Sequence, residues 1–216
     1  MGMKWNLPLR CACLAAAVFL IPDPLQGGTI EGTIPLPAAR KRVTAPQYIS
    51  GGGEVGPASP VVAVVYLKGD FAGVTAPEKP VPRMEQRGFQ FHPSVVPVQV
   101  GGKVEFPNRD SGYHNVFSYS SSKRFDLGRY RKDEEIPSVT FEKAGEVKLY
   151  CEIHDHMRAM VLVLETPFFT STDAEGKFRL EGVPPGRHEL VVWILGKTTT
   201  QPVEVPADGV VRFPSS

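Results

Sequence analysis

Short alternating runs of apolar and polar residues recur along the chain and predict an all-β fold. In residues 146–150, Val147 and Leu149 fall on one face of an extended strand, and the residues between them fall on the other. Residues 29–34 alternate in the same way, whereas residues 61–67 form a continuous β-branched apolar stretch that is typical of a buried strand. No long segment has the periodicity of an amphipathic helix.

The middle of the chain continues this pattern. Residues 89–92 and 95–100 are predicted strands, and the pair Gly101-Gly102 is predicted to form a hairpin turn that returns through residues 103–106. The stretch from Ser118 to Pro137 is serine-rich and then highly charged, which favours a solvated connection between strands.

Composition agrees with many short strands joined by turns. The 216 residues include 21 glycines and 21 prolines, which is below the range of disordered chains and suits frequent turns. The 24 Lys and Arg side chains nearly balance the 23 Asp and Glu side chains. Neither nucleic acid nor an anionic membrane surface is therefore expected as a partner.

Residues 1–27 have the pattern of a secretory signal. Lys4 and Arg10 precede an apolar run from Cys11 to Ile21, which fits the charged and apolar regions of a signal peptide and is too short to span a membrane. We therefore expect a periplasmic or secreted protein with no stable membrane insertion. Removal of this segment would leave Cys151 as the only thiol, so no internal disulfide is expected.

Potential metal donors are concentrated in two places. Most lie in the ten residues that follow the predicted strand at 146–150, and one begins another predicted strand upstream. They are His114, Cys151, His154, His156, Met157 and Met160. Singly, such residues are more often core filler or exposed loop residues. Together, these soft and borderline ligands suit copper, and their spacing favours a mononuclear His₂Cys centre with a weak axial methionine.

The spacing Cys-x-x-His-x-x-Met, followed by Arg158 and read with His114-Asn115-Val116, resembles the type 1 copper site of amicyanin-like cupredoxins. The wider stretch from Phe89 to Glu165 is similar to the plastocyanin/azurin family of cupredoxins. This resemblance implies a Greek-key β-sandwich that binds one copper ion, cycling between Cu(I) and Cu(II). It implies the ligands His114, Cys151, His154 and Met157, with Asn115 tying the two ligand loops together.

A second ligand register is also open. Asp155 and His156 stand where amicyanin-like loops usually carry proline and an aromatic residue. The azurin-like spacing Cys-x4-His-x3-Met is satisfied by Cys151, His156 and Met160. We favour His154 and Met157, because residues 160–164 have the pattern of a core strand in which Met160 has a packing role. His156 is then expected to point to solvent.

The C-terminal part resembles a second sandwich. The pattern T-D-x-x-G-x-F-x-L at 172–180 and the V-P-P-G turn at 183–186 are similar to carboxypeptidase regulatory-like, transthyretin-like domains. Strands that open that fold have counterparts at 29–34 and 61–67, so the copper domain is expected to be inserted into, or joined to, a smaller transthyretin-like β-sandwich. The expected division is 1–27 for the signal peptide, 28–83 and 167–216 for the smaller sandwich, and 84–166 for the copper domain.

Two classes of function fit these observations. A rigid sandwich holding one cysteinate and two imidazoles suits a blue-copper one-electron carrier, with redox proteins as partners. The alternative is a copper-binding or copper-delivery protein, or a metal-free cupredoxin-fold binding module. Zn²⁺ could also fill a Cys-His-His site but would leave the methionine unexplained. No nucleophile or general-base motif is evident, so we expect neither an enzyme nor a small-molecule substrate.

Overall fold

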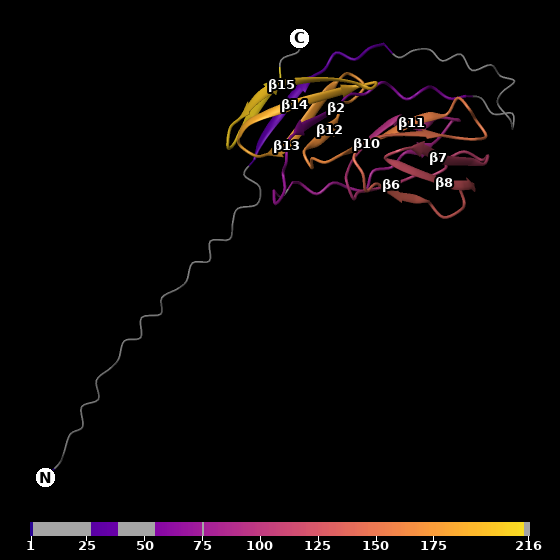
Figure 1. Ribbon diagram of the computed structural model, residues 1–216, viewed down its shortest axis with the longest axis horizontal. Coiled ribbons are helices and arrows are strands. Elements are labelled where there is room, and N and C mark those ends of the chain that lie inside the picture. Colours follow the sequence, from indigo (N-terminus) through magenta and orange to yellow (C-terminus); the bar gives the residue numbers. More distant parts are fainter. Residues whose placement is uncertain (2–26, 39–54, 75, 214–216) are drawn as a thin grey trace.

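The computed structural model describes residues 1, 27–38, 55–74 and 76–213. Residues 2–26 of the expected signal peptide lie outside these ranges. Among the described residues the regular structure consists of strands alone, so the predicted all-β class is correct. In this part of the chain no helix is long and apolar enough to cross a membrane. Figure 1 shows the strands gathered into two side-by-side bodies.

The first body is a β-sandwich formed by the middle of the chain. Its larger layer is a five-stranded sheet with the order β5-β11-β10-β7-β8. The bounds of these strands are β5 Val95–Gln99, β7 His114–Ser120, β8 Lys123–Tyr130, β10 Gly145–Tyr150 and β11 Arg158–Leu164. The facing layer has two pairs of short strands, β3 Glu85–Gln86 with β4 Phe91–His92, and β6 Lys103–Glu105 with β9 Ser138–Thr140.

Alternation along the strands explains the core of this sandwich. Val147 and Leu149 of β10 and Val161 and Val163 of β11 point inward and are buried in one cluster. The same cluster includes Cys151, directly after β10. Burial of each such valine or leucine contributes about 1.5–3 kcal/mol, so the strand ends that carry the metal donors are anchored in a packed interior.

The second body is a smaller sandwich assembled from both ends of the described chain. One sheet has the order β13-β1-β16 and the other has the order β12-β2-β14-β15. The bounds are β1 Gly28–Thr33, β2 Val64–Lys68, β12 Phe169–Ser171, β13 Lys177–Val183, β14 Gly186–Ile194, β15 Lys197–Val205 and β16 Val210–Phe213. Figure 1 shows the indigo strand β1 lying among the yellow C-terminal strands.

The pairing of β1 and β2 with C-terminal strands is the pairing expected from the sequence. β1 is antiparallel to β13 and parallel to β16, and β2 lies between β12 and β14. The first sandwich is therefore inserted between β2 and β12. The resemblance of the second sandwich to carboxypeptidase regulatory-like domains stays a prediction.

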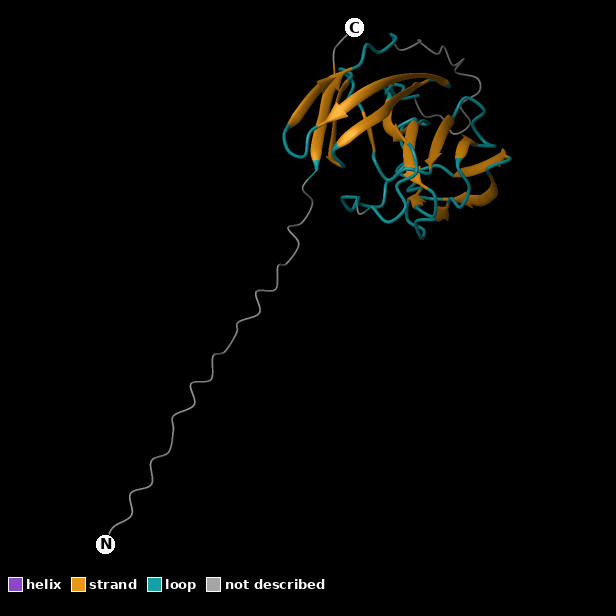
Figure 2. Cartoon of the chain, turned by 60° about the vertical axis from the view of Figure 1, so that its left-hand side comes forward, coloured by secondary structure: helices purple, strands orange, loops and turns teal. Residues whose placement is uncertain are grey.

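An apolar interface joins the two sandwiches. Leu162 and Leu164, on the outer face of β11, pack with Val64 and Trp193 of the second sandwich. The Trp193 indole N–H also donates a hydrogen bond of 2.9 Å to the Glu146 carboxylate of β10. Figure 2, turned by 60° from the first view, shows the same two groups of strands in contact. The outer face of the five-stranded sheet is thus covered on its β5–β11 side.

The predicted hairpin at Gly101-Gly102 is wrong. β5 pairs in parallel with β11, whereas β6 pairs with β9 in the opposite layer. The Val100 N–H donates to the Leu164 carbonyl in one layer, and the Gly101 N–H donates to the Phe141 carbonyl, next to β9. Because the turn is held from both layers, the chain crosses the sandwich there instead of returning along the same sheet.

The predicted solvated connection from Ser118 to Pro137 is also wrong in part. Residues 123–130 form β8, which pairs with β7 as an antiparallel hairpin at the edge of the sheet. Phe125 and Leu127 are half-buried against the core, whereas the alternate residues Arg124, Asp126 and Gly128 are exposed. The many charges obscured this alternation, because an edge strand exposes one face and uses charged side chains to prevent further pairing.

Candidate metal centre

The predicted donors come from two neighbouring strands of the five-stranded sheet. β7 and β10 are antiparallel and adjacent, with Tyr150 opposite Phe117. The first residue of β7, His114, therefore lies at the same end of the sheet as Cys151, which follows the last residue of β10. The turn between β10 and β11 carries His154, whose carbonyl accepts a hydrogen bond of 2.9 Å from the Met157 N–H.

Three donor atoms form a compact triangle at this end of the sheet. His114 Nδ1 lies 3.1 Å from His154 Nδ1, and Cys151 Sγ lies 3.9 Å from the first nitrogen and 3.8 Å from the second. The point equidistant from these atoms is about 2.1 Å from each, by the circumscribed circle of that triangle. Metal–nitrogen and metal–sulfur bonds in proteins are about 2.0–2.3 Å. One ion of that size fits the triangle without rearrangement.

All three donor side chains are shielded from water. His114 is 0% exposed, His154 is 2% exposed and Cys151 is 3% exposed. Burial lowers the pKa of His114 below its ordinary value, although the nearby Asp110 carboxylate acts in the opposite direction. The imidazole is therefore kept neutral, which is the protonation state that binds a metal.

The orientation of His114 is fixed by a carboxylate. His114 Nε2 lies 2.8 Å from Asp110 Oδ2. An ionised carboxylate only accepts hydrogen bonds, so the neutral imidazole carries its proton on Nε2 and presents the Nδ1 lone pair to Cys151 and His154. The sequence analysis missed Asp110. The available signal was its position four residues before His114, in the segment that leads into β7.

Asn115 connects the two segments that carry the donors. Its Oδ1 accepts a hydrogen bond of 2.7 Å from the Glu152 N–H, and its Nδ2 donates one of 3.2 Å to Asp126 on β8. Asn115 is wholly buried. Because this buried side-chain amide accepts a hydrogen bond from the backbone next to Cys151, it holds the two segments at a fixed separation.

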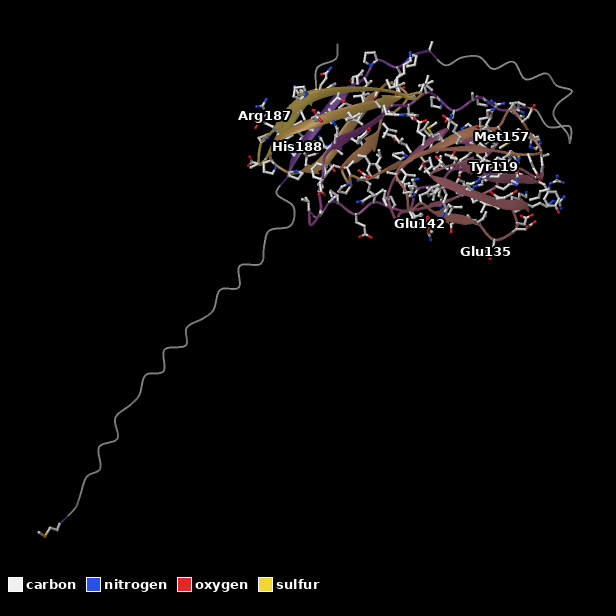
Figure 3. The ribbon with its side chains drawn as sticks, in the orientation of Figure 1. Tyr119, Glu135, Glu142, Met157, Arg187 and His188 are labelled. Carbon is white, nitrogen blue, oxygen red and sulfur yellow. The ribbon has the colours of Figure 1, made fainter. Side chains whose placement is uncertain are left out.

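The two candidate methionines lie on opposite sides of the sheet. Met157 is wholly buried in the same cluster as Cys151. Met160 is half-buried and packs at the interface with the second sandwich, beside Leu162 and Trp193. Figure 3 shows Met157 in the first sandwich, far from Arg187 and His188 of the second. Of the two, only Met157 shares the interior with Cys151.

The expectation that His156 points to solvent is wrong. His156 is half-buried, and its Nε2–H donates a hydrogen bond of 3.0 Å to the Phe89 carbonyl. It does not belong to the group of donor atoms formed by His114, Cys151 and His154 in the described residues. The adjacent turn that contains Phe89 lies over the histidines, which withdraws His156 from water.

Phe89 is a second site residue that sequence reasoning missed. Its ring centroid lies 5.7 Å from that of His114 and 5.0 Å from that of His154, in edge-to-face geometry. The sequence analysis assigned residues 89–92 to a strand, but the strand β4 contains only Phe91 and His92. Phe89 instead has a φ of 57°, and no local sequence signal marks a phenylalanine for that conformation.

No protein-family profile and no curated protein matches the sequence. Solved structures similar to part of it include a copper-containing nitrite reductase from Thermus scotoductus SA-01, with 28% identity, a TM-score of 0.38 and coverage of 44% of this chain and 24% of the reductase. The chain thus spans about a quarter of the reductase. A reduced variant of amicyanin has 24% identity, a TM-score of 0.36 and coverage of 39% and 82%. The purple cupredoxin from Nitrosopumilus maritimus has 22% identity, a TM-score of 0.34 and coverage of 38% and 99%.

The donor set defines what this centre can do chemically. Two imidazoles and one cysteine sulfur, with a thioether in the same interior, form the combination that suits a single copper ion. Attachment of His114 and Cys151 to neighbouring strands, together with the hydrogen bonds of Asn115, restricts movement of the donors. Such a site can bind a soft or borderline ion in a preformed geometry.

Proposed function

We propose that the chain is a blue-copper one-electron carrier with a mononuclear type 1 site, working in the periplasm or outside the cell. The proposed ligands are His114, Cys151, His154 and Met157. One observation carries the proposal: the three strong donor atoms of this chain already surround a point about 2.1 Å from each of them, the distance that metal bonds require.

The residues of this chain would restrict rearrangement during electron transfer. Copper, when bound, supplies a one-electron couple between Cu(I) and Cu(II). His114 and Cys151 are attached to adjacent strands of one sheet, so their separation changes little with the charge of the ion. Asp110 and Asn115 hold the first imidazole and the Cys151 segment through hydrogen bonds of 2.8 and 2.7 Å. Such outer partners tune ligand basicity and potential.

Burial of the donors favours a carrier over a copper-delivery protein. A delivery protein passes its ion to another protein by exchange of ligands, which requires at least one ligand at the surface. His114, His154 and Cys151 are each at most 3% exposed. An electron, unlike an ion, can leave without exchange of ligands, so this burial suits electron transfer.

We propose that the partner in electron transfer is an acidic redox protein. The β7–β8 hairpin presents Arg124 over the exposed ring of Tyr119, and Arg131 just after β8 lies over the half-exposed ring of Tyr113. Neither arginine has a carboxylate partner among the ion pairs of the described residues, whereas Arg129 pairs with Glu152 at 2.6 Å. Positive charge at this hairpin would steer a negatively charged partner toward the chain.

The proposal is tested by adding copper to the purified chain and recording visible absorption and EPR spectra. A carrier should give an intense thiolate-to-Cu(II) band and a reversible one-electron wave. Cys151→Ser should abolish the band and weaken Cu(II) binding more than about 100-fold, beyond the 10–100-fold typical for loss of an outer-shell partner. Met160→Leu is the matched control and should leave band and affinity unchanged.

Two results would reject the carrier. A colourless site that holds only Cu(I), with no reversible wave, would favour copper storage or delivery. An unchanged visible spectrum in Cys151→Ser would reject copper ligation by the thiolate.

A further inference from the structure

The carboxylate of Asp110 holds two different parts of the centre at once. Its Oδ2 lies 2.8 Å from His114 Nε2 and 2.9 Å from the Phe89 N–H nitrogen, and its Oδ1 accepts from the Gly88 N–H at 2.7 Å. The Asp110 side chain is only 14% exposed. Its own backbone N–H donates to Asn108 Oδ1 at 2.9 Å. A carboxylate with three donors directed at it in such a place is fixed in position.

The turn that Asp110 binds covers the histidines. Residues 87–90, here called the Phe89 cap, form a tight turn closed by reciprocal Arg87–Gln90 backbone hydrogen bonds of 2.9 and 3.2 Å. Gly88 and Phe89 have φ values of 59° and 57°. A phenylalanine rarely adopts that conformation, and it persists only where surrounding contacts enforce it.

The contacts that enforce it come from both sides of the Phe89 backbone. The Phe89 N–H is bound by Asp110, and the Phe89 carbonyl is bound by His156 Nε2 at 3.0 Å. The ring is thereby held against both imidazoles. His154 is left 2% exposed, although it belongs to a surface turn.

We propose that Asp110 is a positioning residue that couples His114 to the Phe89 cap. Through one carboxylate it sets the Nδ1 lone pair of His114 toward the metal and closes the cap over the imidazoles. A copper ion at this centre, which rests on the function proposed above, is thereby closed to external anions. Loss of this carboxylate should loosen the cap and the ligand together, because both are bound to it.

The first test uses the metal-free chain at a fixed pH near 8, so that it does not depend on copper. Asp110→Asn keeps the shape of the side chain but removes its charge and one acceptor oxygen; Asp155→Asn, at an exposed carboxylate next to His154, is the control. In the native chain and the control, ¹⁵N NMR should show His114 protonated on Nε2 and a Phe89 amide protected from hydrogen exchange. In Asp110→Asn the Phe89 amide should exchange at least about tenfold faster, and the His114 tautomers should mix.

The second test uses the copper-loaded chain. Asp110→Asn should weaken copper binding about 10–100-fold, the usual cost of losing an outer-shell partner, and azide should perturb its Cu(II) spectrum. Phe89→Ala should admit azide while leaving the His114 tautomer intact, which separates the cap from the ligand. Asp155→Asn should behave as the native chain.

The inference fails if Asp110→Asn keeps the native tautomer, the Phe89 protection and an affinity within twofold of native. Should that variant not fold, the native chain still decides: an Nδ1-protonated His114 or an unprotected Phe89 amide overturns the inference. A native chain that binds no copper would reject the proposed function, while the tautomer and exchange results would stand independently.

Discussion

The two sandwiches of this chain have interiors of different character. The second is filled by apolar residues such as Ile30, Leu67 and Leu190. The first has a comparable apolar core, yet one end of it contains buried imidazoles and amides, including His114, His154 and Asn115. Burial of a polar group costs free energy unless it is hydrogen-bonded. In the first sandwich, two of these buried polar side chains, His114 and His154, converge with Cys151 on one point.

The sharpest way to test this contrast is to remove the same amount of core from each sandwich. Leu149→Ala, two residues before Cys151, and Leu190→Ala, in the second core, should each lower the free energy of unfolding by about 2–5 kcal/mol. Only Leu149→Ala should also weaken copper binding. Equal losses of affinity in both variants, measured by copper titration below the unfolding temperature, would show that the site depends on the whole molecule.

Exchange of the methionines tests whether Met157, just before β11, or Met160, within it, belongs to the metal centre. Met157→Leu and Met160→Leu nearly conserve volume and should each cost less than about 1.5 kcal/mol of unfolding free energy. Met157→Leu should shift the reduction potential and the visible spectrum, because the thioether that we propose as the axial ligand is lost. Met160→Leu should change neither. The opposite result would support the azurin-like register with His156.

Acid should destabilise the metal-free chain through two histidines of the first sandwich. Burial lowers the pKa of His114, and burial also lowers that of His92 in the same sandwich. A lowered folded-state pKa means that the unfolded chain binds the proton first, so folding stability decreases as the pH falls through the unfolded value of about 6.5. For the buried His114 this loss is at most about 1.4 kcal/mol per pH unit, and solvent screening makes the contribution of the half-buried His92 smaller.

The corresponding measurement is urea denaturation between pH 8 and pH 5.5, above the range in which carboxylates titrate. His92→Gln should remove part of this dependence and leave the part that comes from His114. A stability that is flat over this range would contradict the prediction.

The smallest expected effect concerns the β7–β8 hairpin. Arg124→Glu reverses one exposed charge and should leave stability within about 0.5 kcal/mol of native. It should slow oxidation of the Cu(I) chain by the anion hexacyanoferrate(III) and speed oxidation by the cation tris(phenanthroline)cobalt(III), with both effects fading at high salt. Lys197→Glu, at an exposed position in the second sandwich, is the control. Equal effects in both variants would reject the hairpin as the docking surface.

Much of the fold could be predicted because period-two alternation identifies strands wherever one face is buried. This held for residues 146–150 and 29–34. Alternation was missed for β8, because this edge strand exposes many charged side chains. The turn at Gly101 was misassigned for another reason: two strands close in sequence suggested a hairpin, whereas the chain crosses there from one layer to the other. Local patterns do not contain the long-range pairing that decides such cases.

The donors at the metal centre could be proposed from spacing, but their surroundings could not. Cys151 and His154 are close in sequence, so their proximity follows from a turn. Asp110 and Phe89 act through tertiary contacts. The spacing of Asp110 from His114 was a weak hint for that carboxylate, and no local signal marked the Phe89 ring. The same is true of His156, whose place is decided by the carbonyl of Phe89.

The inserted arrangement of the chain has a consequence for assembly. β1 pairs with β16 from opposite ends of the described chain, with Thr29 opposite Val210, and the loop closed by this pairing contains the entire first sandwich. The entropic cost of closing a loop grows with its flexible length. Once the first sandwich has folded, the distance between its two ends is fixed and the loop is effectively much shorter. The first sandwich, a continuous stretch of sequence, can therefore serve as the template on which the two halves of its neighbour are brought together.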